Sequence, residues 1–227
     1  MSDSVQGGHR DDTRRDASRN NFHELVASRR MVRAFRTDPV DRELIARLVD
    51  TASRAPSAGK AQGWHVVVLE GAATEQFWSA TMADSVRAKF RWKHLLAAPV
   101  IALSFADPHA YLERYSEPDK SQSGLGESLE AWPVDYWTVD ASFATMTFLL
   151  AAHDAGLGAL FFGVFNGEAE LRRRLNVPAE MRLIGAIALG YERTPQPHEA
   201  GDAAFGRGAS AARARASVGR VAHFGGW

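Results

Sequence analysis

An apolar segment in the second half of the chain, VDASFATMTFLLAAHDAG (Val139 to Gly156), most restricts what the chain can fold into. Apolar residues occupy nearly every face of a helix drawn over it, so such a helix offers little surface to water. The segment is too short and too polar at its ends to span a bilayer. Gly156 stands where helices commonly end. We therefore expect a central core helix that the rest of the domain covers.

The segments around this helix alternate between helical and strand patterns. Apolar residues at helical spacing, with Pro or Gly near the ends, predict helices at about residues 21–29, 41–54, 73–93 and 168–176. Continuous β-branched or apolar runs predict buried strands at residues 64–70, 99–106, 157–165 and 181–191. Taken alone, this alternation indicates an α/β-type domain in which long helices surround one sheet.

Two segments lack these patterns. Residues 1–20 mix charges with Gly and Ser and contain almost nothing to bury, which predicts a disordered N-terminal tail. Residues 107–136 combine Pro, Ser, Gly and charged residues with several aromatic side chains. A loop this long and this aromatic predicts a lid over an active site. Residues 21–227 are expected to form a single domain.

The composition excludes several classes of function. The 227 residues contain no cysteine, which excludes disulfides, thiolate catalysis and Cys-ligated metals. Lys+Arg and Asp+Glu number 27 each, so no net charge attracts the chain to nucleic acid or to an anionic membrane. The eight histidines form no HxxxH or HExxH motif, so no metal site is predicted. Without a secretory signal or a long apolar stretch, a cytoplasmic location is expected.

Four arginines lie within eight residues, at Arg29, Arg30, Arg33 and Arg36. Taken alone, such a cluster is most simply a solvated face. Interleaved apolar residues instead favour an extended segment with alternating faces. The loop APSAGKAQGW (55–64) follows about one helix later, and its small residues would let a flat ligand approach the backbone. Guanidinium groups and free backbone amides together suit a phosphate.

Recognisable nucleophiles and metal ligands are missing from the sequence. Ser57 and Ser104 lack the glycine context of a serine hydrolase, and GLG at residues 156–158 is no complete dinucleotide motif. A chain without such groups points to a bound organic cofactor that supplies the chemistry. Residues 207–227 contain four arginines and no acids. They form either a flexible basic tail or, given the closing VAHFGGW, an arm that packs on another surface.

These segments together resemble the FMN-dependent nitroreductase family. The matching pieces, in the family's order, are RRMVRAF (29–35), APSAGKAQGW (55–64), AAHDAGLGALFFG (151–163), MRLIGAIALGY (181–191) and the tail RARASVGRVAHFGGW. The resemblance covers about residues 22–227. It implies an α+β sheet–helix sandwich that forms an obligate homodimer with exchanged terminal arms. Residues 207–227 would wrap the partner and bury Val221, Phe224 and Trp227 on it.

The resemblance also implies a set of cofactor-binding positions. They are Arg29, Arg30, Met31, Arg33, Pro56, Ser57, Ala58, Lys60, Gln62, Leu157, Gly158, Arg213 and Arg215. Arg29, Arg30 and Arg33 would hold the phosphate and ribityl end of FMN, and Arg213 or Arg215 would complete this clamp. Pro56, Ser57 and Ala58 would line the flavin from the partner subunit, and Gln62 would support their loop. Leu157 and Gly158 would lie beside the isoalloxazine ring. Met31, Lys60 and Gly63 depart from the family's usual Ser, Asn and Pro.

The implied reaction is a ping-pong oxidoreduction. NADH or NADPH would pass hydride to flavin N5 and leave, and a nitroaromatic, quinone or similar electron-poor acceptor would then be reduced on the same face. No catalytic side chain is required, so none is predicted. Trp132, Tyr136 and Trp137 are candidates for the wall of the substrate cavity; the alternative is that they only pack the 107–136 segment.

Three other functions stay open. Members of the same fold that cleave their own flavin or dehalogenate a substrate would share the phosphate motifs. A non-enzymatic flavin-binding protein would also share them. A nucleic-acid binder that uses the basic tail is disfavoured by the near-zero net charge.

Overall fold

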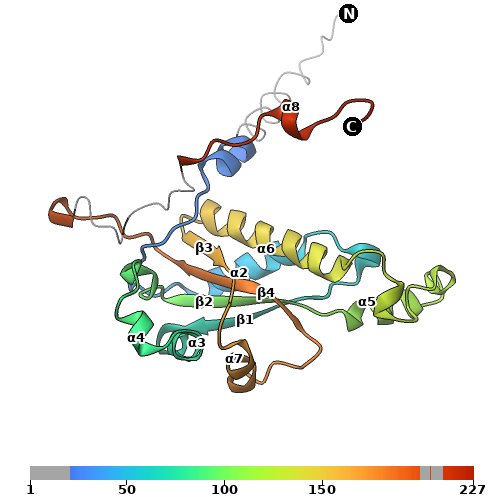
Figure 1. Cartoon of the computed structure of the whole chain (residues 1–227), viewed down its shortest axis with the longest axis horizontal. Helices are drawn as coiled ribbons and strands as arrows, with labels where there is room; N and C mark the ends of the chain where they lie inside the picture. The colour runs from blue at the N-terminus through green and yellow to red at the C-terminus, as the bar shows by residue number, and fades with distance from the viewer. Residues whose placement is uncertain (1–20, 200–204, 206–211) are drawn as a thin grey trace, which may run out of the picture.

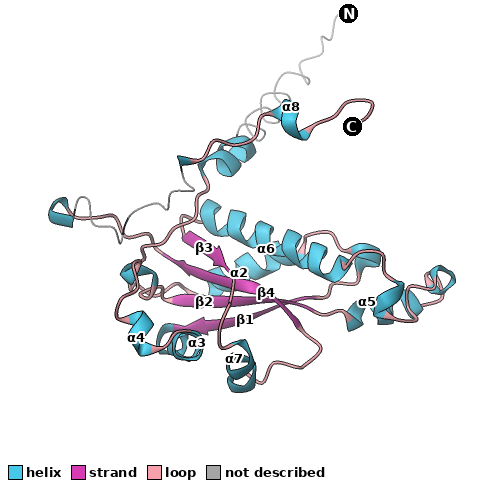
Figure 2. Cartoon of the chain, in the orientation of Figure 1, coloured by secondary structure: helices cyan, strands magenta, loops and turns pink. Residues whose placement is uncertain are grey.

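A computed structural model of the chain describes residues 21–199, 205 and 212–227 (Figure 1). The disorder predicted for residues 1–20 lies outside the described residues, as does the start of the predicted 207–227 arm. The described strands form one sheet with helices on both faces, as the colours of Figure 2 show. Helices α2 (Arg42–Ser53) and α6 (Tyr136–Asp154) cover one face, and α3 (Thr74–Thr81) and α7 (Glu168–Arg174) cover the other.

The four strands match the predicted strand segments closely. They are β1 (Trp64–Glu70), β2 (Val100–Ala106), β3 (Gly158–Phe162) and β4 (Arg182–Gly190), in the order β1-β2-β4-β3. Every pairing is antiparallel. The α/β class indicated by the alternation is therefore wrong, and the α+β class implied by the resemblance is confirmed. A strand buried on both faces is a continuous apolar run in either direction, so its pattern does not reveal its orientation.

Helix α6 forms where the apolar run predicts it. Its inner side packs on the sheet through residues such as Phe148 and Leu149, which are 0% and 4% exposed. Its outer side leaves Phe143 and Met146 47% and 40% exposed. The prediction of a fully covered core helix thus holds for one side only within this chain, and an apolar stripe faces outward.

The single helix predicted for residues 73–93 is wrong. The chain forms α3, then α4 (Asp84–Arg87), then a 3-10 turn at Lys93–Leu95. Met82 and Ala83 adopt extended backbone angles between the two helices, and the Met82 side chain packs against the core on the α3 face. Burial of this side chain therefore overrides the helical preference of the surrounding residues.

The 107–136 segment is folded rather than loop-like. It contains α5 (His109–Ser116) and 3-10 turns at Ser121–Ser123 and Leu129–Ala131. Tyr111 and Trp132 bury their rings together with Trp137 at the start of α6. In Figure 1 this segment extends from the end of the sheet domain at the right of the view.

Both terminal arms project from the same region of the domain. Residues 21–28 are helical, close to the predicted 21–29, and the C-terminal arm carries the short helix α8 (Val218–Val221). In Figure 1 helix 21–28 and the segment that carries α8 both lie above the sheet domain, at the top of the view. Large apolar side chains of the C-terminal arm are exposed, with Phe224 at 93% and Trp227 at 104%. Among the described residues, no helix is long and apolar enough to cross a membrane.

Candidate functional site

The arginine segment is extended and joins the sheet domain, as its alternating pattern predicts. The Val32 amide donates to the Ala159 carbonyl at 2.9 Å, and the Phe35 amide donates to the His94 carbonyl at 3.1 Å. Val32 and Phe35 are 5% and 1% exposed, so they fix the backbone of the segment against the core. The arginines between them are thereby held at defined positions on the domain.

Arg29 and Arg30 line one cavity. It measures about 170 Å³ and lies beside the end of α6, with His153 and Gly158 also in its wall. Arg30 forms an ion pair with Glu192, which follows β4. Arg29 is half-buried. Two guanidinium groups at one cavity suit an anionic ligand such as a phosphate.

Arg33 lies in a second and larger cavity of about 360 Å³ on the α3 side of the sheet. Its guanidinium carbon lies 5.5 Å from the centre of the Trp92 ring, within cation–π range. The remaining wall is mostly aromatic and comes from α3, the turn after α4 and the end of β3; it includes Phe77, Trp78, Phe90, Phe161, Phe162 and Phe165. Among the residues that the structure describes, the result is an apolar cavity with one cation in its wall.

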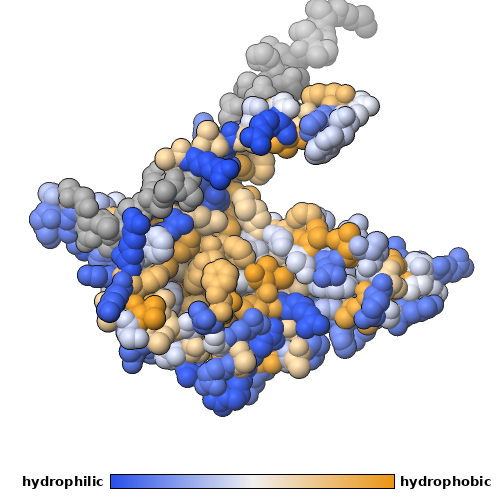
Figure 3. Space-filling model, in the orientation of Figure 1, coloured by the Kyte–Doolittle hydropathy of each residue, from blue (hydrophilic) through white to orange (hydrophobic). Residues whose placement is uncertain are grey.

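Figure 3 shows the surface setting of these cavities. Apolar side chains gather on the part of the domain that lies below the two projecting arms. Phe165, in the aromatic cavity wall, is 90% exposed. This side chain therefore borders the cavity at the protein surface.

The 55–63 loop lines a third cavity of about 60 Å³, which contains Pro56, Ser57 and Gln62. Asp140 also lines it, whereas His153 lines the Arg29 cavity. These two residues are thirteen positions apart on α6, which corresponds to about 20 Å along a helix. Within one chain, therefore, the predicted phosphate arginines and the predicted flavin-lining loop lie at opposite ends of α6.

The loop itself has an uncommon backbone. Lys60 and Gln62 have φ of 62° and 57°, the left-handed region that residues with a Cβ seldom adopt. The Ser57 hydroxyl accepts a hydrogen bond from the backbone amide of Gln62 at 3.1 Å, which closes the loop. Ala58 is half-buried, and the Lys60 side chain is exposed.

With this geometry described, the chain can be compared with known proteins. A family model described as "Nitroreductase family" matches residues 26–191, which is most of the chain. The chain belongs to the nitroreductase family.

Two curated relatives illustrate the range of this family. An NADH dehydrogenase of Thermus thermophilus is 28% identical over 177 residues, which are 72% of this chain and 82% of the relative. A 5,6-dimethylbenzimidazole synthase of Rhodospirillum rubrum is 28% identical over 193 residues, 79% of this chain and 85% of the relative.

Solved structures share the fold. A nitroreductase-like protein from Streptococcus mutans has a TM-score of 0.69 at 18% identity, covering 90% of this chain and 98% of that chain. An FMN-dependent nitroreductase from Clostridium difficile has a TM-score of 0.55 at 22% identity, covering 77% and 89%.

Leu157 and Gly158 line the Arg29 cavity, whereas Met31, Arg213 and Arg215 line none of the three cavities described above. Leu157 is 2% exposed and packs in the core, so only its backbone can reach a ligand. Gly158 lies against Val32, where a Cβ would come within 2.9 Å of that side chain. Met31 packs partly buried between both core clusters. Arg213 and Arg215 lie exposed on the C-terminal arm.

The aromatic residues predicted for the substrate wall divide into two groups. Trp132 and Trp137 are 7% and 5% exposed, and the Trp132 indole N–H donates to the Leu125 carbonyl at 2.8 Å. Both side chains pack the 107–136 segment in this chain. Tyr136 is 39% exposed and remains accessible to a ligand.

Sequence reasoning missed the aromatic cavity wall of this nitroreductase-family chain. The sequence pattern predicts one helix over the segment that contains Phe90 and Trp92, and a continuous strand over FFGVF (161–165). The signal for them was the density of large aromatics at the end of a buried strand, where ligand sites often lie. Arg36, the fourth arginine of the cluster, pairs with Asp38 at 2.8 Å and is not in the wall of either arginine cavity.

Proposed function

We propose that the chain is an FMN-dependent oxidoreductase that uses NADH or NADPH to reduce small electron-poor acceptors such as nitroaromatics or quinones. The observation that carries the proposal is the 360 Å³ cavity, which combines aromatic walls with the Arg33 guanidinium. Cofactor sites have this size and this mixture of apolar walls and a few polar groups. The names of the Thermus thermophilus and Clostridium difficile proteins agree with this chemistry.

The residues present fit FMN. An isoalloxazine ring is flat and largely apolar, which suits the aromatic wall around Phe161 and Trp92. Arg29 supplies positive charge for the phosphate, and Arg30 lies in the same wall with its guanidinium paired to Glu192. An extended segment rises about 3.3 Å per residue, so the Cα atoms of Arg29 and Arg33 are at most about 13 Å apart, and their long side chains could both reach one FMN molecule. The bound flavin would accept hydride from NAD(P)H at N5 and pass electrons to the acceptor.

The side chains of this cavity would orient ligands and stabilise charge. Arg33 places a fixed positive charge at the cavity wall, where it stabilises negative charge that develops on a ligand there. The aromatic side chains exclude water and offer flat surfaces for a planar acceptor. Catalysis in this proposal therefore needs no side-chain nucleophile.

We also propose a homodimer with exchanged terminal arms. The Arg29 cavity and the 56–62 loop lie at opposite ends of α6, so a two-fold partner is needed to bring one beside the other. The exposed side of α6, with Phe143 and Met146, supports an interface there. A groove of about 490 Å³ between helix 21–28, α2 and α6 offers apolar surface for such a partner.

Replacing Phe224 with alanine should weaken this dimer by roughly tenfold or more, since burying a phenylalanine contributes about 1.5–3 kcal/mol. Sedimentation equilibrium or light scattering over a dilution series measures the dissociation constant. Val86→Ala is the matched control, because Val86 is 56% exposed on α4 and lies outside the arm and the cavities. Equal dissociation constants for both variants and the unaltered chain would contradict the exchanged-arm proposal.

A flavin-cleaving activity is the second candidate function. The 5,6-dimethylbenzimidazole synthase of Rhodospirillum rubrum matches 79% of this chain, about as much as the oxidoreductases do. Dehalogenation and non-enzymatic flavin binding are further alternatives on the same scaffold. They differ from the main proposal in what happens to FMN and to NAD(P)H.

The absorption spectrum of the purified chain, before and after anaerobic NADPH, tests these alternatives. We expect a flavin spectrum that NADPH bleaches and a nitroaromatic restores, with the FMN content unchanged over many turnovers. Loss of FMN during turnover would indicate the flavin-cleaving function. A flavin spectrum without NAD(P)H oxidation would indicate a binding protein. A colourless chain that fails to bind FMN would overturn the proposal.

A further inference from the structure

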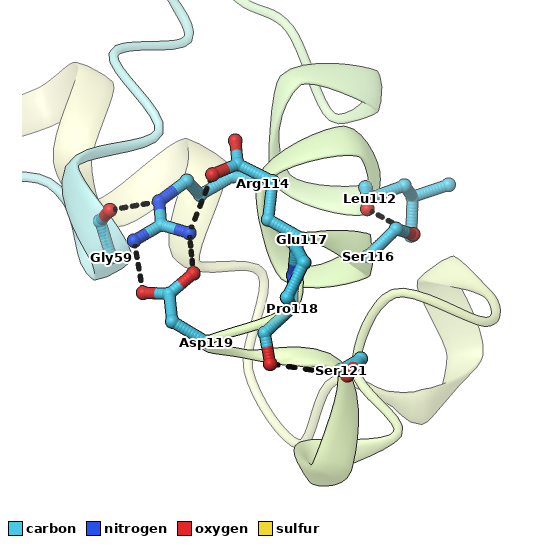
Figure 4. Close-up of polar contacts among 8 residues, drawn as sticks. All are labelled: Gly59, Leu112, Arg114, Ser116, Glu117, Pro118, Asp119 and Ser121. Carbon is cyan, nitrogen blue, oxygen red and sulfur yellow. Dashed lines mark hydrogen bonds and ion pairs between the residues drawn. The ribbon is translucent and has the colours of Figure 1, made fainter.

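The loop at residues 57–62 is held at two points by residues distant in sequence. Asp140, near the start of α6 and 7% exposed, accepts hydrogen bonds from the Ala58 amide at 2.7 Å and from the Tyr111 hydroxyl at 2.8 Å. Arg114 of α5 donates from Nε to the Gly59 carbonyl at 2.7 Å (Figure 4). Both Tyr111 and Arg114 belong to the 107–136 segment.

Arg114 is itself fixed by acidic neighbours. Figure 4 shows its two terminal nitrogens directed at the Asp119 carboxylate, each at 2.7 Å, and one of them also reaches Glu117 at 3.1 Å. The hydrogen bond to Asp119 raises the pKa of Arg114, and the same bond lowers the pKa of Asp119. The two acidic side chains thus hold the terminal nitrogens of Arg114, and Nε stays directed at the loop.

The contact between Tyr111 and Asp140 is buried. Burial raises the pKa of the Tyr111 hydroxyl, and the hydrogen bond to Asp140 raises it further. The hydroxyl therefore keeps its proton and donates it to the carboxylate. Because the Ala58 amide shares the same carboxylate oxygen, α5, α6 and the loop meet at one atom.

The loop needs such support because its backbone is strained. Lys60 and Gln62 have positive φ, a conformation that persists only where surrounding contacts impose it. The Tyr115 ring covers Gly59 so closely that a Cβ there would lie 2.8 Å from the ring. The contacts from α5 and α6 are therefore the tertiary constraints that select this loop conformation.

We propose that Arg114 and Asp140 are positioning residues, which hold loop 57–62 in one conformation and tie the 107–136 segment to the active site. The link to an active site rests on the proposed function, in which this loop lines the flavin. A change in the 107–136 segment then shifts the loop through this pair of contacts.

Trypsin cleavage of the full-length chain at the Lys60–Ala61 bond tests the positioning role directly. Cleavage follows the population of the opened loop when opening is fast. Loss of a hydrogen bond to a charged group shifts such an equilibrium by roughly tenfold or more. We expect Arg114→Ala to raise the rate of this cut by about that factor, measured by mass spectrometry of the fragment that begins at Ala61.

Arg87→Ala is the matched control. Arg87 makes an equivalent two-bond pair with Glu75, at 2.5 and 2.6 Å, away from the loop. The rate at Lys60 should stay within about twofold of the unaltered chain in this variant. Asp140→Asn keeps an acceptor of the same shape, so it should raise the rate less than Asp140→Ala does.

Two results would overturn the positioning role. One is an equal rate at Lys60 in Arg114→Ala and Arg87→Ala. The other is a rise at the exposed Arg173 site by the same factor as at Lys60, which indicates general destabilisation. Neither readout uses NAD(P)H, so the result is independent of whether the chain reduces nitroaromatics. With activity established, Arg114→Ala should raise the acceptor KM several-fold more than it changes kcat; equal changes in all variants would contradict the link to the active site.

Discussion

Replacing Arg33 with alanine is expected to raise the Kd of the chain for FMN by roughly ten- to a hundredfold, because a hydrogen bond to a charged group is worth about 1.5–3 kcal/mol. Arg33 is the cation in the wall of the aromatic cavity, where solvent screening is weaker than at the surface. Titration of the apoprotein, followed by quenching of flavin fluorescence, measures the change.

Two companion variants locate the effect. Arg29→Ala should weaken FMN binding by a similar factor, since Arg29 would contact the phosphate. Only Arg33→Ala should also make the bound flavin harder to reduce, because Arg33 would lie beside the ring. Arg36→Ala is the control: Arg36 pairs with Asp38 outside both cavities and should leave the Kd within about twofold. Equal FMN affinity in all three variants would show that FMN does not bind in these cavities.

Replacing Gly167 with alanine is expected to produce the largest loss of stability. Gly167 precedes α7 with φ of 71°, and a Cβ there would lie 1.8 Å from the Ala80 carbonyl oxygen at the end of α3. That oxygen is a backbone atom, so α3 and α7 must separate, and the buried Leu171 side chain loses its packing. We expect a loss of more than about 3 kcal/mol, since positive φ alone costs about 1–3 kcal/mol.

Gly71→Ala separates the two causes. Gly71 also has positive φ, at 54°, but nothing lies within 4 Å of its added Cβ. This control should therefore show the backbone cost alone. In thermal unfolding each kcal/mol lowers Tm by about 2–4 °C in a chain of this size, so we expect Tm to fall clearly further for Gly167→Ala than for Gly71→Ala. A Tm equal in the two variants would contradict the contact between α3 and α7.

Much of the secondary structure could be predicted from residue patterns. The strands at 64–70 and 182–190 and the helix at 42–53 are bounded by Pro, Gly and polar residues, so their limits are visible. The predicted 73–93 helix failed because Met82 is drawn into the core, a contact between segments that a local pattern does not contain. The predicted α/β class was wrong for a similar reason. The direction of a strand depends on how the strands are connected and not on their composition.

The candidate site was predictable only as a set of motifs. The arginine segment and the loop after α2 are visible as residue types that suit a phosphate and a flat ligand. Their separation to opposite ends of α6 follows from packing, as does the place of Arg33 among aromatic side chains. Phe90, Trp92 and Phe165 are apolar residues without a motif, so only their convergence on one cavity identifies them.

The sequence by itself determined the family, the extended arginine segment, the apolar helix and the absence of cysteine chemistry, because these depend on residue identity and short-range spacing. The tertiary structure alone decided the antiparallel sheet, the aromatic cavity around Arg33 and the meeting of Ala58 and Tyr111 at Asp140. The physical reason is distance along the chain. Ala58 and Asp140 are separated by 82 positions, and no local pattern records that packing places them 2.7 Å apart.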